Sequence, residues 1–500
     1  MKQRLAIIPT LLVLLAVMVL PGASTVHAAT APTWTSIIHY FNPNPDPTNP
    51  PSGYQGEELN VIFFNNLTGD VRDLGTNLIR LRQYQSGKLL VGRTLGIKNF
   101  EGGAVISATV PIVAVYKQTV EGATPYSPVL YTSFDSGLAG SGKYFIPSVQ
   151  HSVLFDTKIG IQNVESQKIT ITLNFYDQAG ALAVVPPVQQ IVDEQKSFVF
   201  KASDYLAEGF DGSLVIQAIV NDGLSTPAKM VAAAQEIQAG GRRAYAFEGM
   251  KEGITKLYMP SAPCEYGSNT QTATLDVQNT GSAPATIQAV FYDTNGVSVA
   301  TYTPASSIPV GAKLSINACD DSIHDLTAGK NLVAVINASS SSIAAVGKVS
   351  SKDGLLTAFT GQVAPTEASS DGKYRTLVPY VEWSATSTGY RTYITVLNAS
   401  GQAAQDVRAI YYTPDGRVSK AKTHTLASAS NPLASNGFRS TNPSAARVIP
   451  RGTRGFLGAV IVESDQPLTV LVRVIRTTRV RNYTTLGDDY NGIPYVLSGQ

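Results

Sequence analysis

The chain repeats one strand-like segment that always ends in asparagine, and this repetition limits what the chain can fold into. The copies are TKIGIQN ending at Asn163, TATLDVQN ending at Asn279 and TYITVLN ending at Asn398. Apolar and polar residues alternate in each copy, which is the period of a β-strand with one buried face. A sheet with a single apolar face needs a second sheet on top of it, so the repeat predicts two-layered β-sandwiches.

Three further signatures recur around each copy of this strand. An aromatic–proline segment precedes it, at 144–149, 258–263 and 377–383. A turn with two aromatic residues follows it, as FYDQAG (175–180), FYDTNG (291–296) and YYTPDG (411–416). A glycine-flanked apolar run comes next, at 209–222, 328–341 and 455–468. The repeated unit is therefore a whole domain and not a single hairpin.

A divergent first copy precedes the three regular ones. LNVIFFNN (59–66) matches the opening strand, LRQYQSGKLL (81–90) matches the aromatic turn, and 99–118 matches the glycine-flanked run. The middle of this copy is shorter, so we expect a trimmed sandwich.

These patterns predict an all-β protein of about four tandem β-sandwich domains after an N-terminal signal peptide. The expected parts are a signal peptide at 1–28, a divergent first repeat at 29–135 with a proline-rich loop at 42–53, repeats at 144–250, 256–361 and 374–488, and a C-terminal tail at 489–500. Short polar linkers at 136–143 and 361–373 predict a beaded rod.

The motif V-x-N-x-G followed by F-Y-D-x-x-G resembles the immunoglobulin-like modules of bacterial secreted and cell-surface proteins of the adhesion-related kind. The residues that carry it are Val277, Asn279, Gly281, Ala285, Phe291, Tyr292, Asp293 and Gly296. The last copy departs from it, because Thr413 replaces the aspartate. The resemblance implies adhesive, spacer or surface-assembly units, and it implies no particular site, because function resides in sites and not in folds.

Residues 1–28 have the form of a secretory signal peptide. Lys2 and Arg4 precede an apolar run at 5–20, and the small-x-small sequence VHA ends at Ala28, which predicts cleavage after that residue. A membrane anchor is the alternative, but Pro9 interrupts a run that is already short. We therefore expect an extracellular or cell-surface protein.

The charge balance excludes one class of partner. The chain has 38 basic and 36 acidic residues, and loss of the two basic residues in the signal peptide leaves a neutral chain. A neutral chain lacks the basic surface that binds nucleic acid. The charged fraction of 15% is also low, which suits β structure rich in Thr, Ser, Val and Gly.

Two cysteines, Cys264 and Cys319, lie in one repeat. In an exported protein such a pair predicts a disulfide, which would stabilise the fold by about 4 kcal/mol in the chain-entropy treatment. Two unpaired buried thiols are the alternative.

Motifs for chemistry are scarce. His39, His151, His324 and His424 fall in different units, without the H-E-x-x-H spacing of a zinc site. The sequence contains no G-x-S-x-G elbow, phosphate loop or zinc-type cysteine spacing. We therefore predict no catalytic residue, no cofactor and no metal, and the chain is not expected to be an enzyme.

One acidic cluster has two interpretations. Asp320, Asp321 and Asp325 lie within CDDSIHDL. Three carboxylates suit Ca²⁺, and an aspartate also suits the start of a helical turn. The capping interpretation is the simpler one.

Two surface features suggest ligands. Arg473, Arg476, Arg479 and Arg481 lie in one strand-like run and would form a basic stripe for anionic polymer, or would guard an edge strand against aggregation. Tyr380, Trp383 and Tyr390 are close enough in sequence to form a patch on which sugars stack. The sequence does not clearly group them on one strand face, however, and the equivalent aromatic–proline positions in the other copies have the pattern of core residues.

Three functions fit these observations. The first is a secreted, non-catalytic structural or adhesive surface protein, whose partners are cell-envelope polymer, other surface proteins or further copies of itself. The second is an extracellular polysaccharide-binding protein, and the third is a secreted hydrolase with an unrecognised site. The insertion at 429–452 in the last repeat is where a specific function would be sought.

Overall fold

The computed structural model describes residues 33–496, except for 48–51, 67–68, 74–78, 92–99, 122–128, 133–139, 241–242, 387–388, 451 and 481–482. The predicted signal peptide lies outside this part. Secondary structure is almost entirely β, in several antiparallel sheets, which confirms the all-β prediction. The helical turns are short: η1 (Ala202–Asp204), α2 (His324–Thr327) and η2 (Val418–Lys420). Among the described residues, no helix has the length and apolar character needed to cross a membrane.

We group the strands into four modules, numbered along the chain, of which module 2 shows the plan most fully. Its strands are β9 (Lys143–His151), β10 (Phe155–Asn163), β11 (Ile169–Tyr176), β12 (Val188–Val192), β13 (Ser197–Lys201), β14 (Phe210–Val220), β15 (Met230–Gln238) and β16 (Ala244–Glu248). The outer sheet has the order β12-β11-β14-β9, the inner sheet has the order β13-β10-β15-β16, and a short pairing of β9 with β10 joins the two into one continuous sheet. Buried and half-exposed residues alternate along all of β11, as the period-two pattern predicts.

Modules 3 and 4 follow the same plan. Module 3 consists of β17 (Lys256–Met259), β18 (Thr272–Asn279), β19 (Ile287–Tyr292), β20 (Ser298–Tyr302), β21 (Lys313–Asn317), β22 (Val333–Ala338), β23 (Ile343–Ser350) and β24 (Leu356–Thr360). Module 4 consists of β25 (Tyr374–Ser384), β26 (Tyr390–Asn398), β27 (Val407–Tyr412), β28 (Lys422–Ala427), β29 (Phe438–Thr441), β30 (Gly455–Ser464), β31 (Leu468–Val480), β32 (Tyr483–Asn491) and β33 (Ile493–Tyr495). The outer sheets are β17-β22-β19-β20 and β28-β27-β30-β25, and the inner sheets are β21-β18-β23-β24 and β29-β26-β31-β32.

Module 1 departs from the plan. Its strands are β1 (Thr33–Phe41), β2 (Glu57–Asn65), β3 (Val71–Asp73), β4 (Ile79–Leu81), β5 (Ser86–Leu90), β6 (Gly102–Ala108), β7 (Val113–Glu121) and β8 (Val129–Thr132). The inner sheet β5-β1-β7-β8 is complete, whereas the outer sheet has β3, β4 and β6 paired with β2. Among the described residues, no strand occupies the place that β9, β17 and β25 take in the other modules.

The sequence alignment of the first copy is therefore wrong by one strand. The opening inner strand is β1, which ends just before Asn42, and not the segment at 59–66. That segment lies in β2 and leads into the aromatic turn, which the sequence pattern placed at 81–90. The alignment fails because the aromatic–proline strand that marks the start of the other modules has no counterpart among the described residues of module 1.

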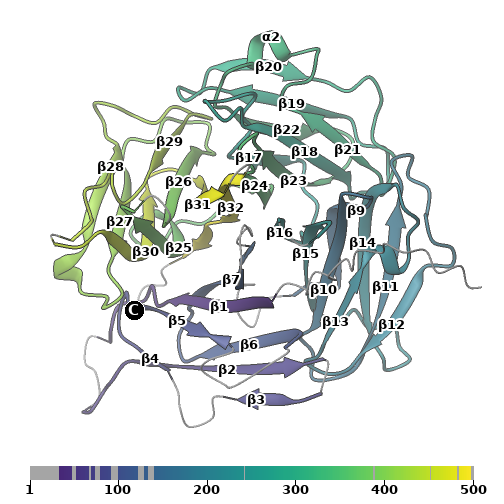
Figure 1. Cartoon of the computed structure of the whole chain (residues 1–500), viewed down its shortest axis with the longest axis horizontal. Coiled ribbons are helices and arrows are strands. Elements are labelled where there is room, and N and C mark those ends of the chain that lie inside the picture. Colours follow the sequence, from purple (N-terminus) through teal and green to yellow (C-terminus); the bar gives the residue numbers. More distant parts are fainter. Residues whose placement is uncertain are drawn as a thin grey trace, which may run out of the picture.

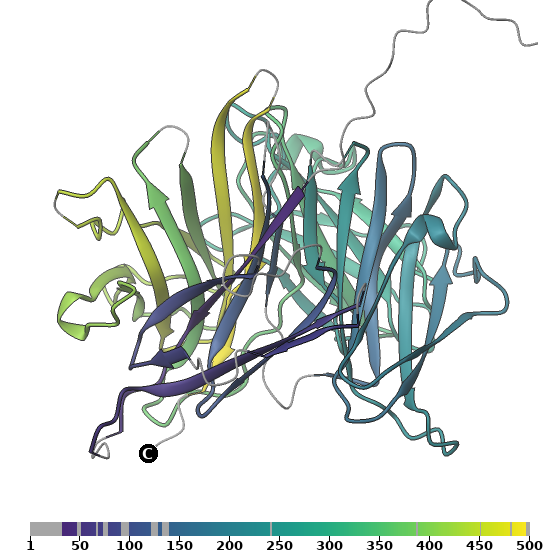
Figure 2. The ribbon, with the colours of Figure 1, turned by 60° about the horizontal axis from the view of Figure 1, so that its bottom comes forward.

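The modules close into a ring, and the predicted beaded rod is wrong. Figure 1 shows the modules around a common centre, and Figure 2 shows the same ribbon turned by 60°. The last inner strand of each module contacts its neighbours in turn: β8 with β16, β16 with β24, β24 with β32, and β32 with β8. The short linkers turn the chain around this axis instead of extending it.

The hydrophobic cores of modules 2, 3 and 4 each include residues from the next module, whereas the core of module 1 consists of its own residues. Val346 and Leu356 of module 3 belong to the core of module 2, and Leu471 of module 4 belongs to that of module 3. Val115 of module 1 belongs to the core of module 4. Separation of two neighbouring modules would therefore expose apolar surface.

The asparagine that ends the first inner strand clamps each module. Asn42, Asn163, Asn279 and Asn398 are all buried. The amide nitrogen of Asn279 donates to the carbonyls of Ala283 and Ile308 at 2.8 Å each, and its oxygen accepts from the Gly281 N–H at 3.0 Å. The other three make the same type of bonds. The amide thereby replaces backbone partners that the chain lacks where the strand ends.

We expect Asn279→Asp to destabilise module 3 by about 2–4 kcal/mol, because a buried carboxylate cannot donate to the two carbonyls. Native-state hydrogen exchange of the β18 amides measures the loss locally. Asn295→Asp, at an exposed turn position, is the matched control and should leave these amides unchanged. Equal exchange in the two variants would contradict the clamp.

Candidate functional site: the junctions between modules

A cation occupies the same place in three of the four modules. The cation always lies opposite the residue five positions before the clamp asparagine. It is Lys117 on β7, Lys348 on β23 and Arg473 on β31. Each side chain points out of its own module towards the preceding one. The cations of modules 3 and 4 contact modules 2 and 3, and the cation of module 1 contacts module 4.

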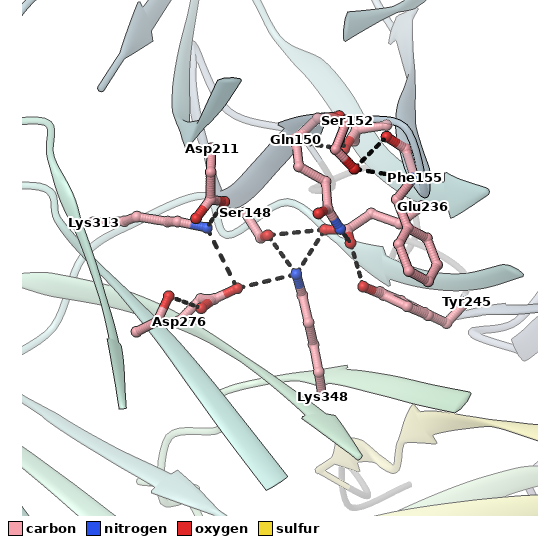
Figure 3. Close-up of polar contacts among 12 residues, drawn as sticks. Ser148, Gln150, Ser152, Phe155, Asp211, Glu236, Tyr245, Asp276, Lys313 and Lys348 are labelled. Carbon is pink, nitrogen blue, oxygen red and sulfur yellow. Dashed lines mark hydrogen bonds and ion pairs between the residues drawn. The ribbon is translucent and has the colours of Figure 1, made fainter. Parts of the chain in front are cut away.

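Figure 3 shows the junction between modules 2 and 3, where buried charges meet. The Lys348 ammonium lies 2.8 Å from Glu236 on β15 and 3.0 Å from Asp276 on β18. It also donates to the hydroxyl of Ser148 on β9 at 2.6 Å. Glu236 is fully buried and accepts further bonds from the side chains of Gln150 and Tyr245. Every charge in this group thus has a charged or polar partner, as burial requires.

A second lysine completes this charge cluster. Lys313 on β21 lies 3.7 Å from Asp276 and pairs with Asp211 on β14. Burial opposes ionisation of Asp276, but Lys313 and Lys348 outweigh it and hold the pKa of that carboxyl below its usual range. Burial also opposes the charge on Lys348, and Asp276 and Glu236 nevertheless raise the pKa of its ammonium well above the ordinary value.

The junction between modules 3 and 4 uses an arginine. The Arg473 guanidinium binds Asp489 on β32 through two nitrogens, at 2.9 and 2.8 Å. Its remaining N–H groups donate to Ser261 and Gln271 of module 3, both at 3.2 Å. The cation is therefore neutralised within module 4 and donates across the junction.

The junction between modules 4 and 1 closes the ring. Lys117 is only 3% exposed, and its ammonium donates to the Tyr380 hydroxyl at 2.7 Å and lies 3.8 Å from Glu382. Burial lowers the pKa of Lys117 to about 8, although Glu382 acts in the opposite direction. The ring of His39 on β1 stacks on Tyr380 with the centroids 4.0 Å apart.

The aromatic–proline signature supplies the acceptor at all three junctions. Ser148, Ser261 and Tyr380 each directly follow the proline of that signature. Each carries a hydroxyl that the cation of the next module reaches. The signature therefore marks one half of a contact between modules.

The aromatic turn forms a second contact with the next module. Its glycines, Gly180, Gly296 and Gly416, all have positive φ. A Cβ on these glycines would lie too close to the next module: 2.8 Å from the Pro309 Cβ at Gly180, 2.2 Å from the Ser435 oxygen at Gly296, and 2.4 Å from the Gln83 oxygen at Gly416. Glycine is needed here for backbone conformation and for close approach together.

The second aromatic residue of the turn packs on the same loop. A Cβ on Gly311 of module 3 would meet the Tyr176 ring at 2.6 Å, and Tyr412 stacks on Tyr84 of module 1 with the centroids 4.6 Å apart. The first aromatic residue of the pair, such as Phe175 or Tyr411, is buried in its own module. The two aromatic positions therefore serve different modules.

The junction between modules 1 and 2 lacks both contacts. Gln235 takes the place of the cation, and its amide nitrogen has no hydrogen-bond partner among the described residues. Lys158, directly across from it on β10, pairs instead with Glu101 at 2.5 Å. The turn glycine of module 1, Gly69, has no described atom within 4 Å of the position that a Cβ would take. The difference coincides with the absence of an aromatic–proline strand from the described part of module 1.

A buried carboxylate ties the inner strands together near the axis. One oxygen of Asp488 on β32 accepts from the Ala246 N–H of β16 at 3.0 Å. The other accepts from the Ala358 N–H of β24 at 3.1 Å. Asp488 thus satisfies amides at the edges of two other inner sheets.

The structure places the residues predicted from sequence as follows. Cys264 and Cys319 lie at disulfide distance, with Cα atoms 5.1 Å apart, which fits the predicted pairing. Arg473 is held inside a junction and is not part of an exposed stripe, whereas Arg476 is exposed. The Arg479 side chain and Arg481 lie outside the described residues.

The predicted aromatic patch is not formed, because Tyr380 is fully buried at the closing junction. In the acidic cluster, the Asp320 carboxylate accepts from the Ser322 N–H and hydroxyl, which is a local turn. Asp321 and Asp325 do not join it in a metal-binding group, since no group of three His, Cys, Asp or Glu suited to a metal occurs among the described residues.

The four histidines stay apart. His151 lies near Asp156, His324 near Glu265 and His424 near Thr441, while His39 is buried at the closing junction. The sequence analysis did not identify Lys117 and Lys348, and it assigned Arg473 to a surface stripe or charged edge. The constant register of these three residues to the clamp asparagine is a signal that an alignment of the repeats contains.

Comparison with known proteins adds little. No protein-family model matches the chain, and no curated protein matches it. Among solved structures, a putative membrane anchored protein from Corynebacterium diphtheriae aligns with 89% of this chain and 97% of its own, at 10% identity and a TM-score of 0.12. So low a score carries no argument about fold or function.

We expect Gly296→Ala to loosen the junction between modules 3 and 4. Gly267→Ala is the matched control, because Gly267 has a similar positive φ, +73° against +76°, but no atom within 4 Å of its Cβ position. Both variants bear the cost of about 1 kcal/mol for alanine at positive φ, and only Gly296→Ala must also displace Ser435. Thermal unfolding should show a larger loss for Gly296→Ala, by at least about 1 kcal/mol. Equal losses would show that the close approach is unimportant.

We expect acid to weaken the closing junction through His39. Burial, with Lys117 and Lys88, lowers the pKa of His39 from 6.5 to about 2. As the pH falls, His39 is protonated in the unfolded chain before it is protonated in the folded one. The stability that neutral His39 contributes is therefore fully present above pH 6.5. It is lost as the pH falls towards 2, by about 1.4 kcal/mol of unfolding free energy per pH unit.

His39→Phe keeps a ring against Tyr380 and should make the melting temperature less sensitive to acid between pH 7 and 4.5. His324→Gln, a change at a half-exposed histidine, should retain the response of the unaltered protein. An unchanged slope in His39→Phe would show that another group controls it.

Proposed function

We propose that the chain is a secreted, non-catalytic structural or adhesive surface protein whose immunoglobulin-like modules form one rigid platform. The observation that carries this proposal is the use of the buried charges. Lys117, Lys348 and Arg473, with their partners, hold neighbouring modules together. Such groups serve assembly when they are fully paired, whereas an active site keeps ionisable groups free to meet a substrate.

Export to an oxidising compartment is the second part of the proposal. The signal-like sequence at 1–28 supports it. The Cys264–Cys319 pair supports it as well, because disulfides persist outside the cytosol. The protein is then extracellular or held at the cell surface.

The partners proposed are cell-envelope polymer, other surface proteins or further copies of the chain. A closed ring presents loops at fixed positions, because each module is held by two neighbours. Part of the long insertion in module 4 is used internally, since Phe438 bonds to Thr294 of module 3. The part around Asn442, which forms an exposed turn with Ser444 and Ala445, is free for binding.

Cell fractionation of the native host tests the location, and binding of the purified secreted chain to cell envelopes tests the role. We expect the protein in the envelope or medium fraction, sedimentation with envelopes, and no release of soluble sugar or peptide from them. Cytoplasmic location, or heat-sensitive release of fragments from the envelope, would overturn the proposal.

A junction variant tests the need for the platform. Lys348→Met leaves Glu236 and Asp276 buried with one cation fewer, which should weaken the fold by about 3–5 kcal/mol and reduce envelope binding. The exposed residue Lys352 provides the control, Lys352→Met, which should bind normally. Full binding by a Lys348→Met protein with an opened ring would show that the modules act singly.

A further inference from the structure

In the described part of module 1, the outer sheet has an unpaired edge where the other modules have a strand. In module 2, β14 lies between β11 and β9, and β22 and β30 are flanked in the same way. Their counterpart in module 1 is β6, because Gly102 approaches the Phe64 carbonyl as Gly212 approaches that of Tyr176. Among the described strands, β6 pairs with β2 alone.

The side chains of β6 are more exposed than those of the equivalent strands in other modules. Ala104, Val105 and Ile106 are half-exposed. The equivalent residues of β14, at 214–216, are buried, and so are those of β30, at 460–462. An apolar strand with an unpaired edge is a ready template for another strand.

A buried polar group also lies at the register where the missing strand would be contacted. At the other three junctions, the cation at this register donates a hydrogen bond to a side-chain hydroxyl. That hydroxyl belongs to the residue directly after the proline of the aromatic–proline strand. In module 2 the residue at this register is Gln235, which is 6% exposed, and its amide nitrogen lacks a partner among the described residues. Buried amides are seldom left unpaired.

If the chain is cleaved after Ala28 as predicted, the segment before β1 is too short to supply the strand. In modules 2 and 4 the equivalent strands, β9 and β25, have 9 and 11 residues and precede the next strand directly. With the predicted cleavage after Ala28, only residues 29–32 precede β1. Among the described residues, no other segment of the chain pairs with this edge of β6.

We propose that the edge of β6 accepts an extended strand from another protein chain. The other modules indicate its chemistry: aromatic and aliphatic residues, then proline, then a residue with a hydroxyl or amide oxygen. Its backbone would pair with β6, as peptides add to open sheet edges in other proteins. The residue after the proline would accept from the Gln235 amide.

A labelled peptide with the sequence of β9, KYFIPSVQH, tests the proposal against the purified secreted chain. We expect saturable binding, and protection of the amides at 102–108 from hydrogen exchange. N-methylation of the peptide at alternate residues gives a matched pair of probes. The N–H groups of alternate residues point to opposite edges of a strand, and only one edge of the added strand bonds to β6. The peptide methylated on the edge that faces β6 should bind at least about tenfold more weakly, and the peptide methylated on the other edge should bind normally.

The role of Gln235 is tested by a double-mutant cycle. Gln235→Ala should weaken the peptide about fivefold, as expected for one neutral hydrogen bond, and a peptide with alanine in place of its serine should show no further loss. Equal losses from Gln235→Ala with both peptides would remove Gln235 from the site.

Three outcomes would overturn the proposal. Protection of 102–108 without peptide would show that the chain fills the edge with its own residues, including an N-terminus that sequencing finds uncleaved. Protection at another sheet would place the site elsewhere, and absence of binding at high peptide concentration would mean that β6 is no acceptor.

Discussion

A buried cation needs acceptors, and in this protein the acceptors lie on or next to the neighbouring module. Lys348 reaches Glu236 and Ser148 across one junction, and Lys117 reaches Tyr380 across another. Because an unpaired buried charge is far more costly than a paired one, modules 3, 4 and 1 are each held in a single orientation relative to the module before them. The arrangement of the chain follows from this local requirement, together with the cores that continue across the same three junctions.

The sequence allowed much of the fold to be predicted. Alternating strands such as TATLDVQN, turns such as FYDTNG and the pair Cys264 and Cys319 are local signals, and the all-β architecture follows from them. The ring could not be predicted in this way. Closure depends on side chains such as Lys117 and Glu382, which are far apart in sequence, and no periodicity within one repeat reveals them.

The errors in the sequence analysis have the same origin. Tyr380 was interpreted as either a sugar-binding or a core residue, and Arg473 as part of an exposed stripe or of a charged edge strand. None of these interpretations included a contact between two modules of the chain. Tyr380 and Arg473 both face a neighbouring module. The first repeat was misaligned because its marker strand is missing, so that Asn42, which is the true clamp, lies inside the segment predicted to be a proline-rich loop.

The contact between neighbouring modules recurs head to tail at three junctions. It joins two different faces, the leading face of one module and the trailing face of the module before it, and is therefore a heterologous contact. Such contacts produce a finite object only when the rotation at each step brings the last unit back to the first. Tyr380 and the turn at Gly416 form the face of module 4 that module 1 covers. A gene rearrangement that removed module 1 would uncover this face, and module 2 could not cover it in the same way, because Gln235 takes the place of the cation. Module 1 is therefore the unit that lets the repeat end in a closed object.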